Sequence, residues 1–490
     1  MNLADVLEQH ARARPAHPAI EQGDHTTTYA ALLRFVLAAE ANLRNAGVKP
    51  GETVVIMLPG RIAHLICMFA LARLGAIVHA VDASETEAEK SRAIEGLGVR
   101  HVIAAADEKP LPGTQVIDYA STRPGSVEPT PAFATMFDGR RPLIVVQSSG
   151  TTGAPKTVIL SHDDMWARTL KNERDVGLDA SDRYLSCLDI NYFAERRRCL
   201  AALCLGGTVI FNDTSTPRDL ADEARDRNAT WMSVTPALVR QFLSDSSVPE
   251  PMFPSLKRLC VSSSFLGPGE RTLARKRLGP NLVERYGINE AGLVTIAYPE
   301  DQEAFPESVG RPIDAIEAQV VDDDDRTLPP GEVGRFRFRA SYIPTRYLDD
   351  PEASAKAFRG GWYYPGDLAA INEQGYLFLK GRSDDVINAG GAKLYPVEIE
   401  AALLDHPAVL EAAVVSGPHP VTGEAPIAFV VTASAVSARE LAKHCSRRIS
   451  RYKVPYRFEF VDELPKNPMG KILKTELRAR TGAPATPPGG

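Results

Sequence analysis

Residues 148–156 read Ser-Ser-Gly-Thr-Thr-Gly-Ala-Pro-Lys and directly follow an apolar run, residues 143–147, that is typical of a buried strand. The two glycines let the backbone turn so that successive N–H groups can face an anion, and the hydroxyls and Lys156 add donors for phosphate oxygens. The widespread loop G-x-x-x-x-G-K-[ST] has four residues between its glycines, whereas only two separate Gly150 from Gly153. Such a segment alone is often a plain turn, but the preceding strand and Lys156 favour a polyphosphate-binding loop.

The segments on the N-terminal side of this loop alternate between helical and strand patterns. Apolar residues recur at helical spacing over residues 29–43, and residues 53–58 then form an apolar run. The order repeats with an apolar helix over residues 62–74 and a strand over residues 76–81. Residues 107–141 are rich in Pro, Gly, Thr and Ser, which predicts a surface excursion without an element. The alternation predicts a layered α/β fold with parallel strands.

The segments on the C-terminal side have a different character. Apolar stretches punctuated by glycine, at residues 316–321, 334–339 and 376–379, predict a small antiparallel sheet. We place a domain boundary at residues 381–385. The segments beyond it are sufficient for a unit that folds on its own, and they predict helices over residues 396–404 and 437–450 and strands over residues 409–415 and 425–431.

Length and composition restrict the class of protein. A chain of 490 residues exceeds what one hydrophobic core usually organises, so two or more domains are expected. The net charge of −6 argues against nucleic acid or an anionic membrane as the main partner and favours a small molecule. Six cysteines without C-x-x-C spacing predict reduced thiols in a cytoplasmic protein rather than disulfides or a zinc site. No stretch reaches the roughly 18 apolar residues that a membrane span needs.

A second segment with chemical potential is residues 284–290, Glu-Arg-Tyr-Gly-Ile-Asn-Glu. The magnesium ion on ATP prefers hard oxygen ligands and keeps several waters, so Glu290 alone would be a sufficient protein anchor. Tyr286 offers an aromatic face on which adenine could stack. In isolation, the segment is better explained as a solvated glutamate and a core tyrosine.

Two further segments follow. Asp367 lies in the turn Pro365-Gly366-Asp367 and could accept both ribose hydroxyls, while Arg382, about fifteen residues later, could bridge ribose and phosphate. Lys471 lies in a glycine-supported turn near the C-terminus and could enter a site as a point charge that offsets the repulsion between a carboxylate and a phosphate. Each motif alone is an ordinary turn, and most surface lysines have no such role.

The order and spacing of all four segments resemble those of the adenylate-forming superfamily, which contains acyl-CoA synthetases, adenylation domains of peptide synthetases and beetle luciferases. The resemblance runs from residue 28 to residue 474, nearly the whole chain. It implies a large N-terminal domain over residues 1–382, built from layered α/β sheets and a small β-barrel-like subdomain. A small mobile α+β lid would occupy residues 383–478, and a disordered tail residues 479–490.

The resemblance also implies an activity. A carboxylic acid would be activated with ATP and Mg²⁺ to an acyl-adenylate and pyrophosphate, and the acyl group would then pass to the thiol of coenzyme A after the lid rotates about a hinge at Asp384. Carried over by position, the catalytic residues are Lys471, Glu290, Thr151 and Thr152, with Glu290 and Thr152 on magnesium. The nucleotide- and CoA-binding residues are Ser148, Ser149, Gly150, Gly153, Lys156, Ser262, Ser263, Ser264, Tyr286, Gly287, Asn289, Asp367, Arg382, Ile387, Gly390, Gly391 and Lys393. The acyl pocket is assigned to Asn191, Tyr192, Phe193, Thr235 and Phe265.

The sequence departs from the family pattern at several positions. Thr157, Pro365 and Arg346 stand where the family usually has glycine, threonine and glycine. Residues 188–200 contain no histidine, although acyl-CoA synthetases commonly carry one there. No clear counterpart exists of the aspartate that holds an α-amino group, which disfavours an amino acid substrate. The run of arginines at residues 196–198 could recognise a second carboxylate, but a charged helix face is the favoured explanation.

Three alternatives stay open at the level of sequence. The acyl acceptor could be the phosphopantetheine arm of a carrier protein, or it could be a free amine. From another class, the chain could be a non-catalytic nucleotide-binding protein. The joint presence of Glu290, Asp367, Arg382 and Lys471 argues against that last alternative, because a protein that only binds has no need of the lysine.

Overall fold

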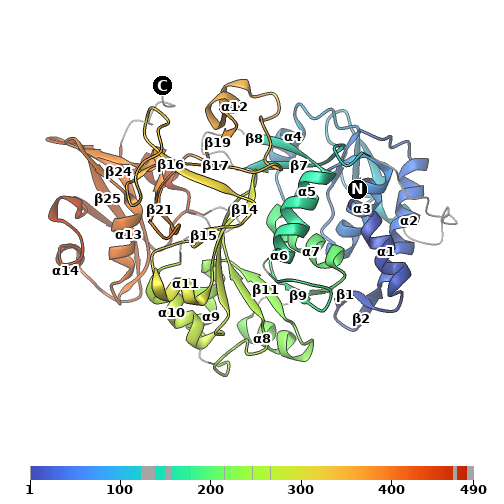
Figure 1. Ribbon diagram of the computed structural model, residues 1–490, viewed down its shortest axis with the longest axis horizontal. Coiled ribbons are helices and arrows are strands. Elements are labelled where there is room, and N and C mark those ends of the chain that lie inside the picture. The colour runs from blue at the N-terminus through green and yellow to red at the C-terminus, as the bar shows by residue number, and fades with distance from the viewer. Residues whose placement is uncertain are drawn as a thin grey trace.

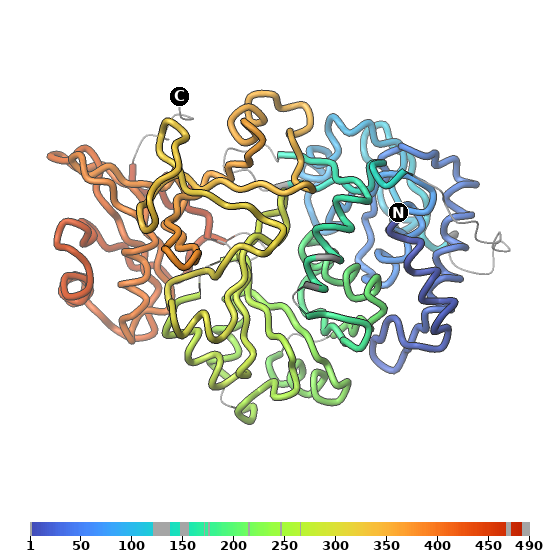
Figure 2. Tube along the Cα trace, in the orientation of Figure 1, coloured from blue at the N-terminus to red at the C-terminus, as the bar shows by residue number. Residues whose placement is uncertain are grey.

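The computed structural model describes residues 2–122, 138–148, 156–175, 177–213, 216–245, 247–264, 266–466 and 472–482. Its strands form four sheets, and the chain passes from the N-terminal sheet at one end of the molecule to the C-terminal sheet at the other (Figures 1 and 2). Among the helices of these ranges, none is long and apolar enough to cross a membrane.

The first sheet contains the strands around the predicted phosphate loop, in the order β6-β5-β3-β4-β7-β8. Its first five strands pair in parallel, and β8 runs antiparallel to β7. All four residues of β3 are buried, as expected for a parallel strand that is covered on both faces. The strands are β3 (Thr53–Ile56), β4 (Ile77–Ala80), β5 (His101–Ala104), β6 (Gln115–Asp118), β7 (Pro142–Ser148) and β8 (Lys156–Ser161).

The prediction of a surface excursion without an element over residues 107–141 was wrong in part. Strand β6 lies inside that range and is followed by a 3-10 turn, Tyr119–Thr122. The strand is short and extends the sheet edge by pairing with β5. Proline and glycine on either side of such a strand obscure its signal in the sequence.

The second sheet is the largest, with nine strands in the order β15-β14-β13-β12-β11-β9-β10-β1-β2. Its central strands β13, β12, β11, β9, β10 and β1 pair in parallel. The strands are β1 (Pro18–Gln22), β2 (His25–Thr28), β9 (Arg183–Ser186), β10 (Thr208–Phe211), β11 (Trp231–Val234), β12 (Arg258–Val261), β13 (Leu282–Ile288), β14 (Gly292–Ala297) and β15 (Arg311–Pro312). These two sheets confirm the predicted layered α/β fold.

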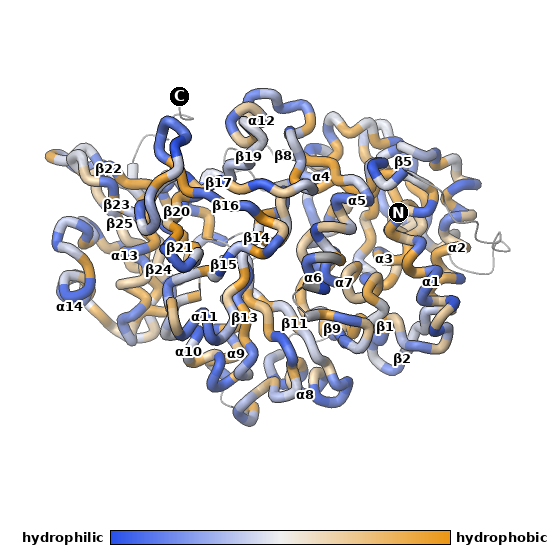
Figure 3. The backbone as a smooth tube through the Cα atoms, in the orientation of Figure 1, coloured by the Kyte–Doolittle hydropathy of each residue, from blue (hydrophilic) through white to orange (hydrophobic). Residues whose placement is uncertain are grey.

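Helices connect and cover the strands of both sheets (Figure 1). Helix α3 is buried almost all round, and it ends at Gly75, whose φ of 76° is left-handed. The helices of this region are α1 (Asp5–Ala13), α2 (Tyr29–Asn45), α3 (Arg61–Leu74), α4 (Glu87–Ile94), α5 (His162–Met165), the π-helix Trp166–Lys171, α6 (Asn172–Asp175), α7 (Phe193–Leu205), α8 (Pro217–Asp226), α9 (Pro236–Ser244), α10 (Pro268–Arg277) and α11 (Pro299–Ala304). Helix α8 buries one side, which includes Leu220 and Ala221, and the rest of the helix is mostly hydrophilic (Figure 3).

The third sheet confirms the predicted small antiparallel sheet. Its order is β18-β19-β17-β20-β21, and β16 pairs with β17. The strands are β16 (Glu317–Val321), β17 (Gly334–Arg339), β18 (Phe358–Arg359), β19 (Trp362–Tyr363), β20 (Asp367–Ile371) and β21 (Leu377–Arg382), with helix α12 (Pro351–Ala357) before β18. Strands β20 and β21 place Asp367 directly opposite Arg382.

The C-terminal segment begins after a 3-10 turn, Ser383–Asp385, and has hydrophobic clusters of its own. Its sheet consists of β22 (Ile387–Ala389), β23 (Ala392–Leu394), β24 (Val409–His419), β25 (Gly423–Thr432) and β26 (Arg457–Phe460). Its helices are α13 (Pro396–Leu404), α14 (Ala438–Cys445), the 3-10 turn Arg451–Lys453 and α15 (Lys474–Arg480).

Two predicted limits in this segment were wrong. The helix expected over residues 437–450 ends at Cys445, and the N–H groups of Arg447 and Arg448 bond three residues back, which closes the helix in turns. Residues 479–481 do not belong to the predicted tail, because α15 continues to Arg480 and Thr481 is buried, with its hydroxyl donating to the carbonyl of Ser416 (3.4 Å). The remaining residues of the predicted tail, 483–490, lie outside the described residues.

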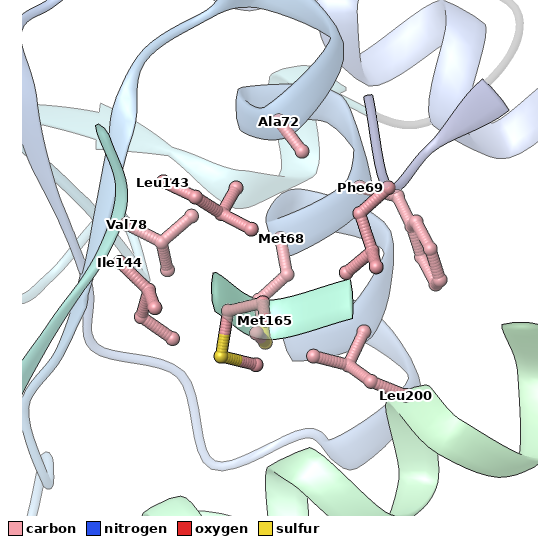
Figure 4. A pocket seen from close by; sticks show the side chains of 9 residues that line it. Met68, Phe69, Ala72, Val78, Leu143, Ile144, Met165 and Leu200 are labelled. Atoms are coloured by element: carbon pink, nitrogen blue, oxygen red, sulfur yellow. The ribbon is translucent and has the colours of Figure 1, made fainter. Parts of the chain in front are cut away.

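A small cavity lies within the first core, between α3, β4, β7 and α7 (Figure 4). All nine side chains that line it are apolar, among them Met68, Met165 and Leu200. A cavity without polar groups cannot orient a charged substrate. It is a packing defect of the core, and the candidate site lies elsewhere.

Candidate active site

The predicted phosphate loop spans the gap between β7 and β8. Ser148 at the end of β7 stands opposite Lys156 at the start of β8, so the antiparallel pair fixes both ends of the loop. Ser149, Gly150, Thr151, Thr152 and Gly153 lie outside the described residues, as do Phe265 and Lys471. Their predicted roles stay predictions.

The predicted ribose residues form one contact cluster. The Tyr286 hydroxyl donates to Oδ2 of Asp367 (2.5 Å), and Nη1 of Arg382 donates to Oδ1 (3.3 Å) and to the carbonyl of Pro365 (2.6 Å). Burial works to lower the pKa of Arg382, but the charges of Asp367 and Asp384 hold it above its ordinary value. The cluster therefore presents an aspartate that is fixed by a tyrosine on one side and by an arginine on the other.

Gly366 is required for this arrangement. Its φ is 85°, a left-handed conformation that side chains rarely adopt, and a Cβ there would lie 2.9 Å from Nη2 of Arg382. Glycine at this position lets the arginine approach the backbone, which explains the Gly-Asp pair noted in the sequence.

Glu290 is a deeply buried carboxylate of this region. Its side chain is 4% exposed, and Oε1 accepts a hydrogen bond from the Tyr347 hydroxyl (3.2 Å). Oε2 is buried without a hydrogen-bond partner among the described residues. A buried carboxylate oxygen normally finds a donor or a cation. Glu290 thus fits the predicted magnesium ligand, and no group of three acidic, His or Cys side chains in the described ranges offers an alternative metal site.

Tyr347 links Glu290 to the flank of the phosphate loop. Nζ of Lys156 lies 5.4 Å from the centre of its ring, a cation–π distance. Tyr347 was not among the predicted site residues, although the preceding residue, Arg346, departs from the family pattern. No periodicity in the sequence reports a contact between residues 156, 290 and 347.

Hydrogen bonds from side chains to backbone carbonyls hold the residues around Glu290 in place. Arg168, fully buried, donates to the carbonyls of Asn289 (2.5 Å) and Glu290 (3.1 Å), and Nδ2 of Asn289 donates to the carbonyl of Gln147 in β7 (3.3 Å). Gly287 lies at a register shift between β13 and β14, where a Cβ would meet the carbonyl of Gly292 at 2.4 Å. Close packing of the two strands therefore explains why residue 287 is a glycine, without requiring a role in nucleotide binding.

The predicted acyl-pocket residues lie at the starts of α7 and α9. Asn191 and Tyr192 precede α7, and Phe193 opens it, largely buried. The Thr235 hydroxyl caps α9 by accepting from the N–H of Leu238 (3.3 Å), so the start of the helix explains the threonine at this position.

The serines predicted to contact the nucleotide follow strand β12. Ser262 accepts a hydrogen bond from Arg198 (2.9 Å), and Ser263 beside it has a left-handed φ of 90°. Ser263 and Ser264 are exposed.

The explanation of residues 196–198 as a charged helix face was wrong. Arg196, Arg197 and Arg198 are 4%, 6% and 4% exposed. Their guanidinium groups are hydrogen-bonded inside the protein, Arg197 to Glu173 of α6 (2.8 Å) and Arg196 to the carbonyls of Ile190 (3.0 Å) and Asn191 (2.5 Å). A run of charges reads as a solvated face only while its partners, which lie elsewhere in the chain, are unknown.

Glu173 is the anion of this buried network. Its Oε1 accepts from Arg197 (2.8 Å) and from Arg285 of β13 (2.7 Å). Burial disfavours the charged carboxylate, yet Arg285 and Arg197 together lower the pKa of Glu173 to about 2. The network therefore joins α6, α7 and β13 behind the loop that carries Glu290.

Replacing Glu173 by glutamine should destabilise the protein by about 3–5 kcal/mol at neutral pH, because two buried arginines lose their counter-charge. The contribution of Glu173 is fully present above its unfolded pKa of about 4.3 and is lost as the pH falls through its folded pKa. Thermal unfolding from pH 7 to pH 3 should therefore show a pH-dependent component in the parent protein that is absent from Glu173→Gln. Glu317→Gln, which removes an exposed ion pair with Arg339, should change little. Equal melting temperatures for Glu173→Gln and the parent would contradict this role.

The remaining predicted residues lie in the C-terminal segment. Gly390 and Gly391 form the turn of the β22–β23 hairpin, with φ of 59° and 90°, and Lys393 is exposed. The Ile387 side chain is fully buried in the core of this segment, and the predicted role of this residue in cofactor binding stays a prediction. Asp384 lies in the connecting 3-10 turn, 3.6 Å from Nε of Arg382.

Comparisons with known proteins identify the family of the chain. The family model for AMP-binding enzymes matches residues 7–348, and that for the AMP-binding enzyme C-terminal domain matches residues 398–471. A 2-succinylbenzoate–CoA ligase of Geobacillus kaustophilus is 30% identical over 97% of both chains. A fatty acid–[acyl-carrier-protein] ligase of Streptomyces coeruleorubidus is 29% identical over 98% of this chain and 96% of its own.

Among solved structures, the o-succinylbenzoate CoA synthetase of Bacillus subtilis, in complex with its acyl-adenylate intermediate, superimposes with a TM-score of 0.89. It is 24% identical and covers 96% of this chain and 97% of its own. This likeness confirms the fold, and the family models cover both the N-terminal and the C-terminal part of the sequence. The chain is a member of the AMP-binding enzyme family, within the adenylate-forming superfamily.

Proposed function

We propose that this enzyme activates a carboxylic acid with ATP and passes the acyl group to coenzyme A. The carboxylate oxygen bonds to the α-phosphorus as the bond to pyrophosphate breaks, and the thiol sulfur then bonds to the acyl carbon as AMP leaves. The observation that carries the proposal is the buried Glu290 carboxylate, with one oxygen free of partners among the described residues, in a family of AMP-binding enzymes.

The first step brings an anion to an anion. Preorganised positive charges and donors lower such a barrier because they stabilise the charge that develops in the transition state. We assign this role to Lys156, Lys471 and the donors of residues 148–153, and we assign the ribose to Asp367 and Arg382. Glu290 and Thr152 would hold Mg²⁺, which when bound would neutralise phosphate charge.

The acceptor and the domain motion are also proposals. We place the hinge at Asp384, between the third sheet and the C-terminal segment, and we place the passage for the pantetheine chain along the Gly390–Gly391 turn. The relative that transfers fatty acids to an acyl carrier protein supports a second candidate, in which the acceptor is carrier-protein phosphopantetheine. All six cysteines are free thiols, which suits a reducing compartment, and we propose the cytoplasm.

Mass spectrometry of reactions with Mg-ATP and a panel of aliphatic, aryl and dicarboxylic acids, each with and without coenzyme A, tests the proposal. We expect an acyl-adenylate without coenzyme A and an acyl-CoA with it, for a limited set of acids. Adenylate that accumulates but is never consumed by coenzyme A would favour a carrier protein or an amine as acceptor. The absence of both products across the panel would contradict acid activation.

A further inference from the structure

Four buried arginines form a cluster behind the candidate active site. They come from the π-helix, from α7 and from β13, and each is at most 6% exposed. The arginine cluster consists of Arg168, Arg197, Arg198 and Arg285. Buried arginines are costly unless paired, so their counter-charges need to be identified.

The buried carboxylates do not balance this cluster. Glu173, Glu195 and Glu290 are the buried acidic groups that contact or adjoin it, so four positive charges face three negative charges. Glu173 binds both Arg197 and Arg285, while Arg168 donates to backbone carbonyls, which carry no full charge. An excess of one positive charge remains in a buried region next to the site.

Arg198 makes no hydrogen bond to a carboxylate among the described residues. Its closest acidic atom is Oε2 of Glu195, at 3.6 Å. Glu195 already accepts from the hydroxyls of Tyr184 (2.7 Å) and Ser186 (2.6 Å), and burial raises its pKa, which disfavours its charged form. Nε of Arg198 is buried without a hydrogen-bond partner among the described residues.

The other contact of Arg198 points to the substrate side. Its Nη2 donates to Oγ of Ser262, which directly follows strand β12. Ser262 is half-buried, and the next residues, Ser263 and Ser264, are exposed. Because β11, β12 and β13 run parallel, Ser262, Thr235 and Glu290 all lie beyond the carboxyl ends of neighbouring strands, where open α/β sheets bind their ligands.

We propose that Arg198 and Ser262 bind a second anionic group of the acid substrate, a carboxylate or a sulfonate, at the end remote from the carboxylate that is activated. The inference rests on the proposed function and names its substrate class. A planar guanidinium with unused donors suits the two oxygens of such a group, and an anion at this place offsets the excess positive charge.

Paired acids test the proposal on the unmodified enzyme. Each pair has the same carbon skeleton and differs only in its remote end, which is a methyl group in one acid and a carboxylate or sulfonate in the other. We expect kcat/KM for pyrophosphate release to favour the doubly anionic acid by about 10²-fold, because the acid that ends in a methyl group leaves a buried arginine unpaired. Equal values for both members of every pair would overturn the inference while leaving acid activation intact. Pyrophosphate release with neither class of acid would instead refute the proposed function.

Variants identify the residue. In Arg198→Gln the preference for the doubly anionic acid should fall about 10²-fold, and in Ser262→Ala about tenfold, because a charge-assisted hydrogen bond is lost. Arg225→Gln, which changes an exposed arginine of α8, should keep the preference. If Arg198→Gln weakens ATP binding equally for all acids and keeps the preference, the arginine serves the nucleotide and the inference is wrong. If that variant does not fold, as checked by circular dichroism, the paired acids and Ser262→Ala decide.

Discussion

Glu290→Gln is expected to lower the rate of acyl-adenylate formation by about 10²–10³-fold, the size typical of losing one preorganised electrostatic contact. Glutamine keeps the shape of the side chain and an oxygen that can accept from Tyr347, so the hydrogen bond at 3.2 Å should survive. The change removes the negative charge from the carboxylate oxygen that has no partner among the described residues. The variant should also need a higher Mg²⁺ concentration for half-maximal rate.

A matched control separates this effect from general disturbance of a buried glutamate. Glu284 lies in β13, the strand that leads to Glu290, is equally buried, and pairs with Arg271 at 2.7 Å. Glu284→Gln should lower the melting temperature and leave the Mg²⁺ dependence unchanged. Binding of Mn²⁺ with a non-hydrolysable ATP analogue, followed by electron paramagnetic resonance, gives a second readout. Parent-like Mn²⁺ affinity in Glu290→Gln would refute its assignment as a metal ligand.

Local patterns in the sequence were sufficient to place several elements of the fold. The helix α3 and strands β3 and β4 follow from apolar runs of the expected length, and the hairpin of β24 and β25 follows from two β-rich stretches. Both kinds of signal come from residues that are close in sequence. Strand β6 was missed because four residues between proline- and glycine-rich segments carry too little periodicity.

The candidate site was predictable only in part, for the same reason. The motifs assigned Asp367 and Arg382 to the ribose and Tyr286 to the adenine, and the structure places these three side chains in contact. The buried arginines were misjudged because Arg197 pairs with Glu173 of another helix, and Glu173 also pairs with Arg285 of a distant strand. Such long-range pairing decides whether a charged run faces solvent, and no local pattern reports it.

Asp384→Pro is expected to leave acyl-adenylate formation within a few-fold of the parent rate and to suppress acyl-CoA formation by about 10²-fold or more. Asp384 lies in a 3-10 turn, Ser383–Asp385. Such turns have φ of about −60°, close to the value of about −65° that a proline ring imposes. Proline should therefore fit the present arrangement of the two parts of the chain. It should disfavour any arrangement that requires a different φ at residue 384.

The contacts around the turn are compatible with movement. Arg478 of α15 donates to the carbonyl of Asp384 (3.2 Å) and pairs with Asp385, while the N–H of Ser383 donates to the carbonyl of Gly366 (2.8 Å), so a few contacts hold the turn from both sides. Hinges absorb large torsional changes in a few residues at the ends of elements, and this position lies between the last strand of one sheet and the first strand of the next. Asp384→Ala, which keeps torsional freedom and loses the side chain, is the matched control and should support both half-reactions. Single-turnover measurements of each half-reaction separate the outcomes, since equal loss of both in Asp384→Pro would mean that residue 384 is a structural turn rather than a hinge.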